Sequence, residues 1–580
     1  MRMIGAFLAP SITHPTINVR QLGQRAVNSY LSDLYPDPEE DLHAPNHQAR
    51  PVRSGHFVRL MPIPISDPYL IGCSALMAKE LGLQGCDGQD FLRLFSGQVR
   101  GFDGFDTPWA TPYALSIYGQ EVIPPGVDPL NGDGYGDGRV LSLGEVQADS
   151  GSRWELQLKG SGPTPFRRSG DGRAVLRSSL REFIASEAMH ALGVSTTRAL
   201  SLIASRVDVV YRPWYKNASV NIALGAQSQE RHGGDMMREE FCAITTRGSR
   251  SFLRVGQFER YGRRVRLGID GALRELELLA RHALAREYSE VQSKNAHAPL
   301  GPQLIGMARM AAHRMANLSA EWMRVGYVQS NFNSDNALIG GVTLDYGPFG
   351  FLEKYNPNWG MWIGAGDHYA FSNQPLAMEA NFQMFARSLE PLLETSDVTV
   401  MRELSKNFST LASTKVDQMW ALKLGLPVGL SKHLVFKLDS LLQAHPTDYT
   451  IFFRELTNIL DSVDSIDVIH LQKAFHQPLT SELTKSWNAW LKSWIFALQE
   501  AGRPLPVVAD KMRRANPRYI PREWLLAEAY TAAERGDFKP FHSLQMVLLR
   551  PYEYQGDVDA HYYQIPPKGT ELQGGIGFMS

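Results

Sequence analysis

The residues with the clearest chemical potential lie between Val328 and Gly350, in the stretch VQSNFNSDNALIGGVTLDYGPFG. Asn336 and Asp345 offer the hard oxygen ligands that Mg²⁺ prefers. Asp335, which precedes Asn336, is the nearby carboxylate that could take a proton from a hydroxyl nucleophile. The stretch therefore predicts a metal site beside a general base. The alternative is a structural one, a turn followed by the end of a strand.

The same stretch follows the outline of a kinase catalytic loop, with one difference. The kinase pattern H-x-D-x-x-x-x-N, followed by D-F-G, falls here on Gln329, Asn331 and Asn336, and then on the DYG that begins at Asp345. The metal-binding half of the pattern is kept. Asn331, however, stands where a kinase has its catalytic Asp, and an amide cannot accept the proton. Ordinary phosphoryl transfer is therefore disfavoured, and Asp335 becomes the candidate base.

Two upstream segments could hold a nucleotide. Residues Asn131 to Val146 read NGDGYGDGRVLSLGEV, in which four glycines precede a β-like run. Glycine lets backbone N–H groups come close to phosphates, although a flexible hairpin is the alternative. The next run, WELQLKGSG, alternates apolar and polar residues and predicts a half-buried strand that ends at Lys159. A kinase-like fold has its phosphate-pairing lysine at this place, whereas a solvent-facing lysine is the structural alternative.

A helix is predicted after these segments, within SGDGRAVLRSSLREFIASEAMHALG. Glu182, near its start, could pair with Lys159 as the corresponding glutamate does in kinases. Ser179 and Glu182 also have the spacing of a capping box, which would give the glutamate a purely structural role. The glycine loop, lysine strand, glutamate helix and Asn/Asp pair occur in kinase order, which favours metal-assisted nucleotide chemistry.

Composition and charge exclude several other classes of protein. The chain has 580 residues, a formal net charge of −1 and 43% hydrophobic residues, which indicates a globular protein of two or more domains. This balance gives no reason to expect a nucleic acid or a membrane as partner. Cys73, Cys86 and Cys242 suggest no plausible disulfide framework. We expect a soluble intracellular protein in the cytoplasm, with mitochondrial import as an alternative, because the leader-like start is poor in acids.

The pattern along the chain divides it into three parts. Residues 1–50 read as a leader or surface arm, 51–375 as a kinase-like nucleotide-binding and catalytic core, and 376–580 as a mostly helical region packed on that core. In the helical part Trp487, Trp490 and Trp494 share one helix face, which predicts a buried core stripe.

From about Phe57 to about Asp537 the chain resembles the selenoprotein O family of protein adenylyltransferases, which have a pseudokinase fold. The segments that carry the resemblance include FVRLMPIPI, LQLKGSGPTPFRRSGDGRAVLRSSLREF, SEAMHALGVSTTRALSL, FLRVGQFE, DNALIGGVTLDYGPFGF and EWLLAEAYTAAERGD. The resemblance implies an α/β (α+β), protein-kinase-like two-lobed fold with an additional helical C-terminal region. It also implies that AMP is transferred from ATP to Ser, Thr or Tyr hydroxyls of proteins, the chain itself included, with release of pyrophosphate.

The resemblance implies a role for each matching residue. Asp335 would be the general base, and Asn336 and Asp345 would hold Mg²⁺, with Mn²⁺ as an alternative. The implied nucleotide-binding residues are Gly136, Gly138, Arg139, Lys159, Asp171, Gly172, Glu182, Arg247, Arg254 and Asp345.

The chain departs from the family pattern at three places. The family's YAGHQFG reads YALSIYG from Tyr113, its HGVMNTDN reads QSNFNSDN from Gln329, and no cysteine follows Cys242. Two alternatives to protein adenylylation therefore stay open, a catalytically inactive nucleotide-binding scaffold and a kinase-like phosphotransferase. A redox role for the C-terminal tail is not supported.

Overall fold

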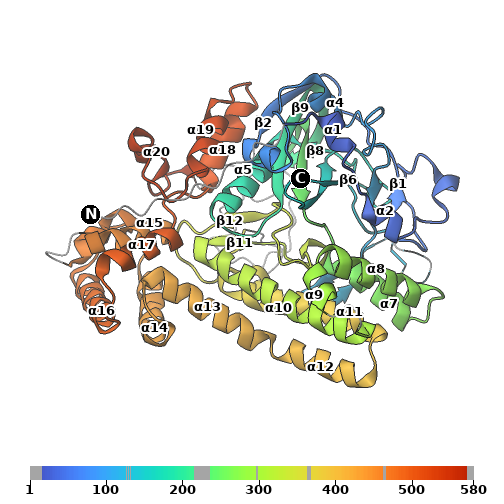
Figure 1. Ribbon diagram of the computed structural model, residues 1–580. Coiled ribbons are helices and arrows are strands. Elements are labelled where there is room, and N and C mark those ends of the chain that lie inside the picture. Colours follow the sequence, from blue (N-terminus) through green and yellow to red (C-terminus); the bar gives the residue numbers. More distant parts are fainter. Residues whose placement is uncertain are drawn as a thin grey trace, which may run out of the picture.

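The computed structural model describes residues 16–125, 127–128, 130, 132, 134–214, 236–294, 298–361, 367–461 and 466–570, and it is a mixed α/β structure (Figure 1). Its main sheet has eight strands in the order β1-β3-β6-β7-β10-β9-β2, with β8 paired to β10. Each neighbouring pair is antiparallel. The strands are β1 (Val58–Arg59), β2 (Pro68–Cys73), β3 (Trp109–Ala110), β6 (Val140–Gln147), β7 (Arg153–Lys159), β8 (Ala174–Val175), β9 (Arg198–Trp214) and β10 (Met236–Ser249).

Strand β7 is buried on both faces, which differs from the half-buried strand that its alternation predicts. Leu156 and Leu158 are buried in an apolar cluster, as expected. Glu155, Gln157 and Lys159 on the other face are also buried. These polar side chains stay buried because each has a hydrogen-bonding partner, Ser142, Arg247 and Glu182 respectively. A solvent-facing role for Lys159 is therefore excluded.

One helix crosses the sheet and brings the candidate glutamate to it. Helix α5 (Leu176–Ala191) contacts β9 and β10 and is buried along most of its length. Its N-cap is Val175, so Ser179 lies inside the first turns and not at the cap. The capping-box interpretation of Ser179 and Glu182 is therefore wrong, and Glu182 is available for another partner.

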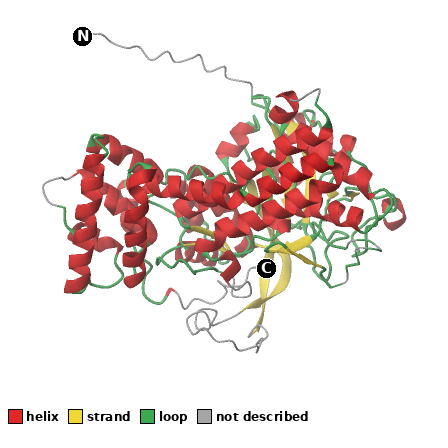
Figure 2. Cartoon of the chain, turned by 90° about the horizontal axis from the view of Figure 1, so that it is seen from below, coloured by secondary structure: helices red, strands yellow, loops and turns green. Residues whose placement is uncertain are grey.

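The remaining chain is mostly helical. Its helices lie in front of much of the sheet when the molecule is seen from below (Figure 2). The longest helix, α10 (Leu300–Val325), contacts α11 and α13. The other long helices are α7 (Val255–Arg266), α8 (Ala272–Arg286), α11 (Gln374–Leu389), α12 (Thr395–Lys406), α13 (Phe408–Leu424), α14 (Val428–Ala444), α15 (Tyr449–Asn458), α16 (Ser481–Glu500), α17 (Leu505–Ala515), α18 (Glu523–Ala533) and α19 (Lys539–Leu548). On α16, Trp487, Trp490 and Trp494 are all buried, which confirms the predicted core stripe.

The described part of the N-terminal segment packs on the sheet. Val19 and Leu22, in α1 (Val19–Gly23), belong to an apolar cluster that includes Leu143 of β6. Tyr30, in α2 (Ser29–Asp33), stacks on Trp109 with ring centroids 5.7 Å apart. Residues 16–50 are therefore part of the folded body, while the start of the predicted leader lies outside the described residues.

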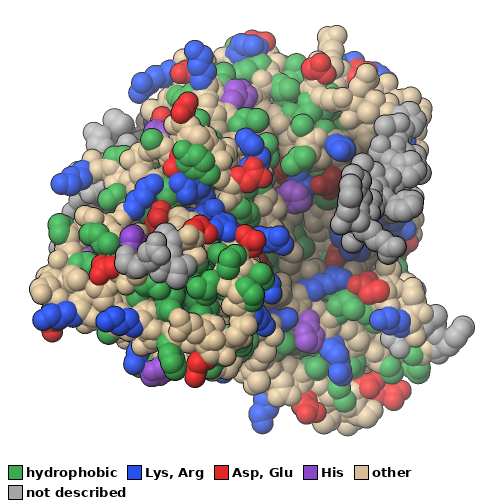
Figure 3. Space-filling model, turned by 60° about the vertical axis from the view of Figure 1, so that its left-hand side comes forward, with side chains coloured by type: hydrophobic (Ala, Val, Ile, Leu, Met, Phe, Trp, Pro, Cys, Tyr) green, Lys and Arg blue, Asp and Glu red, His purple; other side chains and the backbone are tan. Residues whose placement is uncertain are grey.

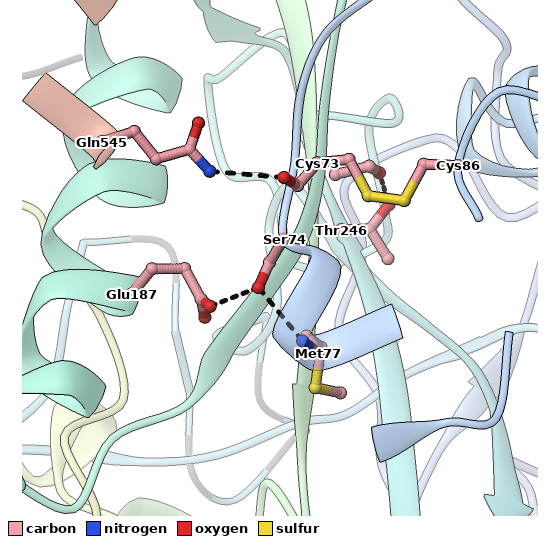
Figure 4. Close-up of a disulfide and its surroundings, with 8 residues drawn as sticks. Cys73, Ser74, Met77, Cys86, Glu187, Thr246 and Gln545 are labelled. Carbon is pink, nitrogen blue, oxygen red and sulfur yellow. Dashed lines mark hydrogen bonds between the residues drawn. A yellow bond between two sulfur atoms is a disulfide. The ribbon is translucent and has the colours of Figure 1, made fainter. Parts of the chain in front are cut away.

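The expectation that the cysteines form no disulfide is wrong. Cys73 at the end of β2 and Cys86 are joined by a disulfide, with their Cα atoms 6.3 Å apart (Figure 4). Helix α3 (Ala75–Glu80) turns the chain back between them, an approach that the spacing of 13 residues does not reveal. Cys242 is free and buried. Cysteine usage therefore no longer supports a reducing compartment.

Basic and acidic side chains are interspersed on the face of the molecule in Figure 3, which is hollowed near its middle. None of the helices in the described ranges is both long and apolar enough to span a membrane.

Candidate active site

Lys159 lies at the end of β7, where it meets the helix that crosses the sheet. Its Nζ donates a hydrogen bond to Glu182 Oε2 on α5, at 2.6 Å, and both side chains are less than one-tenth exposed. The predicted lysine–glutamate pair is therefore confirmed. Because β7 pairs with β6, Lys159 also lies beside Val140, the first residue after the glycine-rich loop.

Asp345 joins this pair and turns it into a cluster. Its Oδ1 accepts hydrogen bonds from Lys159 Nζ and from Arg247 Nη1, the latter at 3.2 Å. Arg247, on β10, also approaches Glu182 Oε1 at 3.4 Å, and Gln157 accepts from two of its nitrogens at 3.1 Å. Burial alone would raise the pKa of Asp345, but the charges of Lys159 and Arg247 outweigh it and hold that pKa well below its usual value. Two cations and two carboxylates thus form one charged centre, the Lys159 cluster.

Asp335 has a different environment. It lies in a short 3-10 helix, η2 (Ser334–Asn336), and its Oδ2 accepts a hydrogen bond of 2.7 Å from the Tyr135 hydroxyl. Its Oδ1 is enclosed and has no hydrogen-bond partner in the described part of the chain. Burial raises the pKa of Asp335, and the Tyr135 hydroxyl and the nearby cation Arg254 only partly offset the effect. Within the described ranges, the Asp335 carboxylate therefore has no direct ionic partner.

Arg254 connects the glycine-rich loop to the loop of Asp335. Its Nη1 donates to the main-chain oxygen of Asp335 at 3.0 Å, and its Nη2 donates to Asp137 Oδ1 at 2.6 Å. Its guanidinium lies over the ring of Tyr113, 4.6 Å from the centroid. Asp137 is itself buried and accepts from the main chain and the hydroxyl of Thr111, at 3.1 and 2.6 Å. Arg254 is thus held on three sides by protein groups.

Asn336 and Asp345 come together through a bridge between their loops. Ala337 pairs antiparallel with Thr343, so each candidate metal ligand lies within two residues of one bridge. Asn336 Nδ2 donates to the main-chain oxygen of Asn331 at 3.0 Å, which leaves its amide oxygen available. Asp345 uses Oδ1 for both cations, which leaves Oδ2 available. These oxygens suit a divalent cation such as Mg²⁺, which often takes only one or two protein ligands. Among the described residues there is no group of three or more His, Cys, Asp or Glu that could hold a metal.

The glycine positions have structural reasons of their own. A Cβ on Gly136 would clash with the main-chain oxygen of Thr111, and one on Gly138 would press against Phe166. Gly172 has a φ of +74° and packs against Pro163. These positions therefore require glycine for chain packing, whether or not a nucleotide is bound.

Arg139 and Asp171 lie near the cluster, but Asp171 has another partner. Asp171 is exposed and accepts from both terminal nitrogens of Arg212 on β9, at 2.7 and 2.8 Å. Arg139 is partly exposed, and its charge helps to lower the pKa of both Asp171 and Asp345. Arg139 is thus close enough to act electrostatically on both Asp171 and the Lys159 cluster.

The structure also reveals site residues that sequence reasoning missed. Tyr135 and Asp137 lie inside the glycine-rich loop, for which the sequence pattern predicted a role only for the glycines. Tyr113 begins the segment that departs from the family pattern, and Gln157 lies on the face of β7 that was expected to be exposed. The signal for Asp137 was an acid between two glycines, but nothing local indicated its arginine partner.

Comparisons with known proteins give a consistent result. A family model described as protein adenylyltransferase SelO matches residues 130–548. The chain is 33% identical over 567 residues to a protein nucleotidyltransferase YdiU from Azoarcus sp. (strain BH72), covering 95% of this chain and 98% of the relative. A protein nucleotidyltransferase YdiU from Thioalkalivibrio sulfidiphilus (strain HL-EbGR7) is 34% identical over 543 residues, covering 92% and 98%. One from Xanthomonas axonopodis pv. citri (strain 306) is 35% identical over 556 residues, covering 94% and 97%.

Proposed function

Since the chain belongs to the SelO family of protein adenylyltransferases, we propose that the Lys159 cluster binds the phosphates of ATP and that Asp335 activates the acceptor. The protein is a nucleotidyltransferase that transfers AMP to proteins. The acceptors are Ser, Thr or Tyr hydroxyls, and the chain itself is one candidate.

The observation that carries this assignment is the contrast between the two aspartates. Asp345 contacts both Lys159 and Arg247, and its pKa is lowered. Among the residues that the structure describes, none forms an ion pair with the Asp335 carboxylate, and its pKa is raised by burial. Two neighbouring acids held in opposite electrostatic environments support different roles. An ionised Asp345 suits a metal ligand, whereas a carboxylate that only a hydroxyl contacts suits a base for hydroxyls.

The transfer step needs one proton acceptor and one leaving group. Asp335 takes the proton of the acceptor hydroxyl as its oxygen forms a bond to the α-phosphorus of ATP. The bond from that phosphorus to the bridging oxygen of pyrophosphate breaks, and pyrophosphate leaves with the electron pair. Lys159, Arg247 and Arg139 supply positive charge for the phosphate oxygens, and the arginines can do so with two donors in a plane. The backbone N–H groups around Gly136, Gly138, Asp171 and Gly172 would complete the nucleotide site.

Asn336 and Asp345 would hold Mg²⁺, or Mn²⁺ in its place, through the two available oxygens. A bound divalent cation would neutralise phosphate charge and orient the phosphates. Glu182 keeps Lys159 in place, and Arg254 joins the main-chain oxygen of Asp335 to the Asp137 carboxylate.

The proposal extends to the architecture and the compartment. The main sheet with α5 corresponds to the smaller lobe of a two-lobed kinase-like fold, and the region of α7 to α10 with η2 corresponds to the larger lobe. The region from 376 onward is then the added helical part. The cytoplasm, with mitochondrial import as the alternative, stays a prediction, and the Cys73–Cys86 disulfide does not support it.

The test is label transfer from ATP in the presence of Mg²⁺. ATP labelled on the α-phosphate should label protein, ATP labelled on the γ-phosphate should not, and mass spectrometry should find an AMP-sized adduct. Label from the γ-phosphate alone would identify a kinase. ATP binding without either label would identify a scaffold.

A further inference from the structure

The Tyr135 hydroxyl lies on the candidate base, where an acceptor hydroxyl would have to bind. It donates to Asp335 Oδ2 at 2.7 Å, a normal length for a hydroxyl bound to a carboxylate. The other oxygen, Oδ1, is enclosed by protein. In this conformation an incoming hydroxyl meets an enclosed Oδ1 and an Oδ2 to which the Tyr135 hydroxyl is already bound.

Asp335 is held firmly by its surroundings. Arg254 bonds to its main-chain oxygen at 3.0 Å. The hydroxyl of Ser334 accepts the main-chain N–H of Ser116 at 2.8 Å, and the main-chain N–H of Asn336 donates to Asn333 at 2.9 Å. These bonds tie the short helix η2 on both sides of the carboxylate. The base is therefore not the partner that moves.

Tyr135 is buried beneath a single exposed side chain. Arg168 is exposed and its guanidinium covers the tyrosine ring, with Cζ 4.8 Å from the centroid. Tyr113 packs edge-on against the same ring, with centroids 5.4 Å apart. Arg168 is thus the side chain that separates the ring from solvent. In the sequence, Tyr135 lies between two glycines, Gly134 and Gly136. Displacing Arg168 would uncover the tyrosine ring, and the space that this ring occupies ends at Asp335.

We propose that Tyr135 occupies the acceptor position on Asp335 and must be displaced by the hydroxyl that receives AMP. This inference rests on the proposed function, because it presumes that Asp335 is the base. Tyr135 then covers the base and competes with acceptors for it. Its phenol indicates that the space can hold a tyrosine side chain of an acceptor protein.

The first experiment compares Tyr135→Phe with the wild type. Initial rates of AMP transfer are measured with α-labelled ATP at increasing concentrations of an acceptor-containing cell lysate, and separately at increasing ATP. Removal of the competing hydroxyl should lower the half-saturating lysate concentration about tenfold, since a hydrogen bond to a charged group is worth at least that factor. The KM for ATP and the maximal rate should stay close to those of the wild type.

Tyr261→Phe is the matched control. Tyr261 is a buried tyrosine whose hydroxyl donates to the main-chain oxygen of Gly55 at 2.8 Å, away from the site. Its replacement also removes a buried tyrosine hydroxyl, but one that contacts a main-chain oxygen and not Asp335, so neither kinetic constant should move. A lower maximal rate of Tyr135→Phe with an unchanged acceptor constant would overturn the proposal, because the tyrosine would then orient the base and not compete for it.

A second variant tests the space itself. Tyr135→Ala should accept p-cresol and release cresyl-AMP and pyrophosphate, which the wild type should not do. A folded Tyr135→Ala protein that labels protein but leaves p-cresol unmodified would refute the proposal. If the wild type transfers no AMP to any acceptor, the proposed function itself fails, and the two failures are thereby told apart.

Discussion

Replacing Asp335 by Asn separates base catalysis from every other role of this residue. The amide has nearly the same shape, and its oxygen can still accept the Tyr135 hydroxyl that now lies 2.7 Å from the carboxylate. Arg254 bonds to the main-chain oxygen, which the substitution does not touch. What Asp335→Asn removes is the capacity to take a proton.

The expected loss of rate in Asp335→Asn comes from the loss of this proton acceptor alone. Loss of a positioned base lowers the rate by about 10²–10⁴, which corresponds to about 3–5 kcal/mol in the barrier. ATP affinity should stay within a few-fold of the wild type, because the cations contact Asp345 and not the Asp335 carboxylate. The unfolding free energy should not fall, because burial already disfavours the charged form of Asp335 and raises its pKa.

Three measurements check these expectations. Transfer of α-label gives the rate, calorimetric titration with ATP and Mg²⁺ gives the affinity, and urea unfolding gives the stability. Asp41→Asn is the matched control, since Asp41 is an exposed aspartate remote from the site and its replacement should change none of the three.

If Asp335→Asn transferred AMP at more than about a tenth of the wild-type rate, Asp335 would not be the base, since a general base contributes more than that. Loss of ATP binding together with transfer would also contradict it, because Asp335 would then belong to the nucleotide site.

Single substitutions can test the Lys159 cluster, the contact between Asp137 and Arg254, and the buried acid Glu155. Asp345→Asn should abolish Mg²⁺-dependent ATP binding, seen by calorimetry, because Lys159 and the metal lose their shared carboxylate; unchanged affinity would remove Asp345 from the site. Asp137→Asn and Asp448→Asn each break a buried pair with arginine, and each should destabilise by about 3–5 kcal/mol in urea unfolding. Only Asp137→Asn should lower the specific activity of the protein that remains folded. Equal losses of activity in the two variants would contradict a role for the contact between Asp137 and Arg254. Burial raises the pKa of Glu155 from 4.5 to about 7. Between these pH values the folded protein holds a proton on Glu155 that the unfolded chain releases. The contribution of Glu155 to the unfolding free energy should therefore fall as pH rises from 4.5 to about 7. The stability of Glu155→Gln relative to the wild type should therefore rise between about pH 5 and about pH 8, and a flat difference in unfolding free energy would contradict the assignment.

Several site residues could be predicted from the sequence because their neighbours in the chain carry the signal. Asp335, Asn336 and Asp345 lie within one short stretch whose spacing matches a known metal-binding pattern. Lys159 ends an alternating strand, and Glu182 lies in a segment with helical periodicity. The Trp487, Trp490 and Trp494 stripe was predictable for the same reason, since residues three and four apart share a helix face.

Other features depend on contacts between distant parts of the chain. The disulfide of Cys73 and Cys86 depends on the turn through α3, and the burial of both faces of β7 depends on the partners that later segments bring to it. The capping-box interpretation of Glu182 failed because the helix begins at Leu176, a start that tertiary packing sets.

The order of residues in the chain was enough to predict the kind of chemistry: a lysine strand, a glutamate helix, and an amide and two carboxylates in one loop, in kinase order. The partner of each charge follows only from how the chain folds. Arg254 meets Asp137 and the loop of Asp335 across separations of 117 and 81 residues, and Tyr135 meets Asp335 across 200. The strength of a charge–charge or hydrogen-bonding interaction depends on distance and burial in space, and local spacing in a sequence contains neither quantity for residues so far apart.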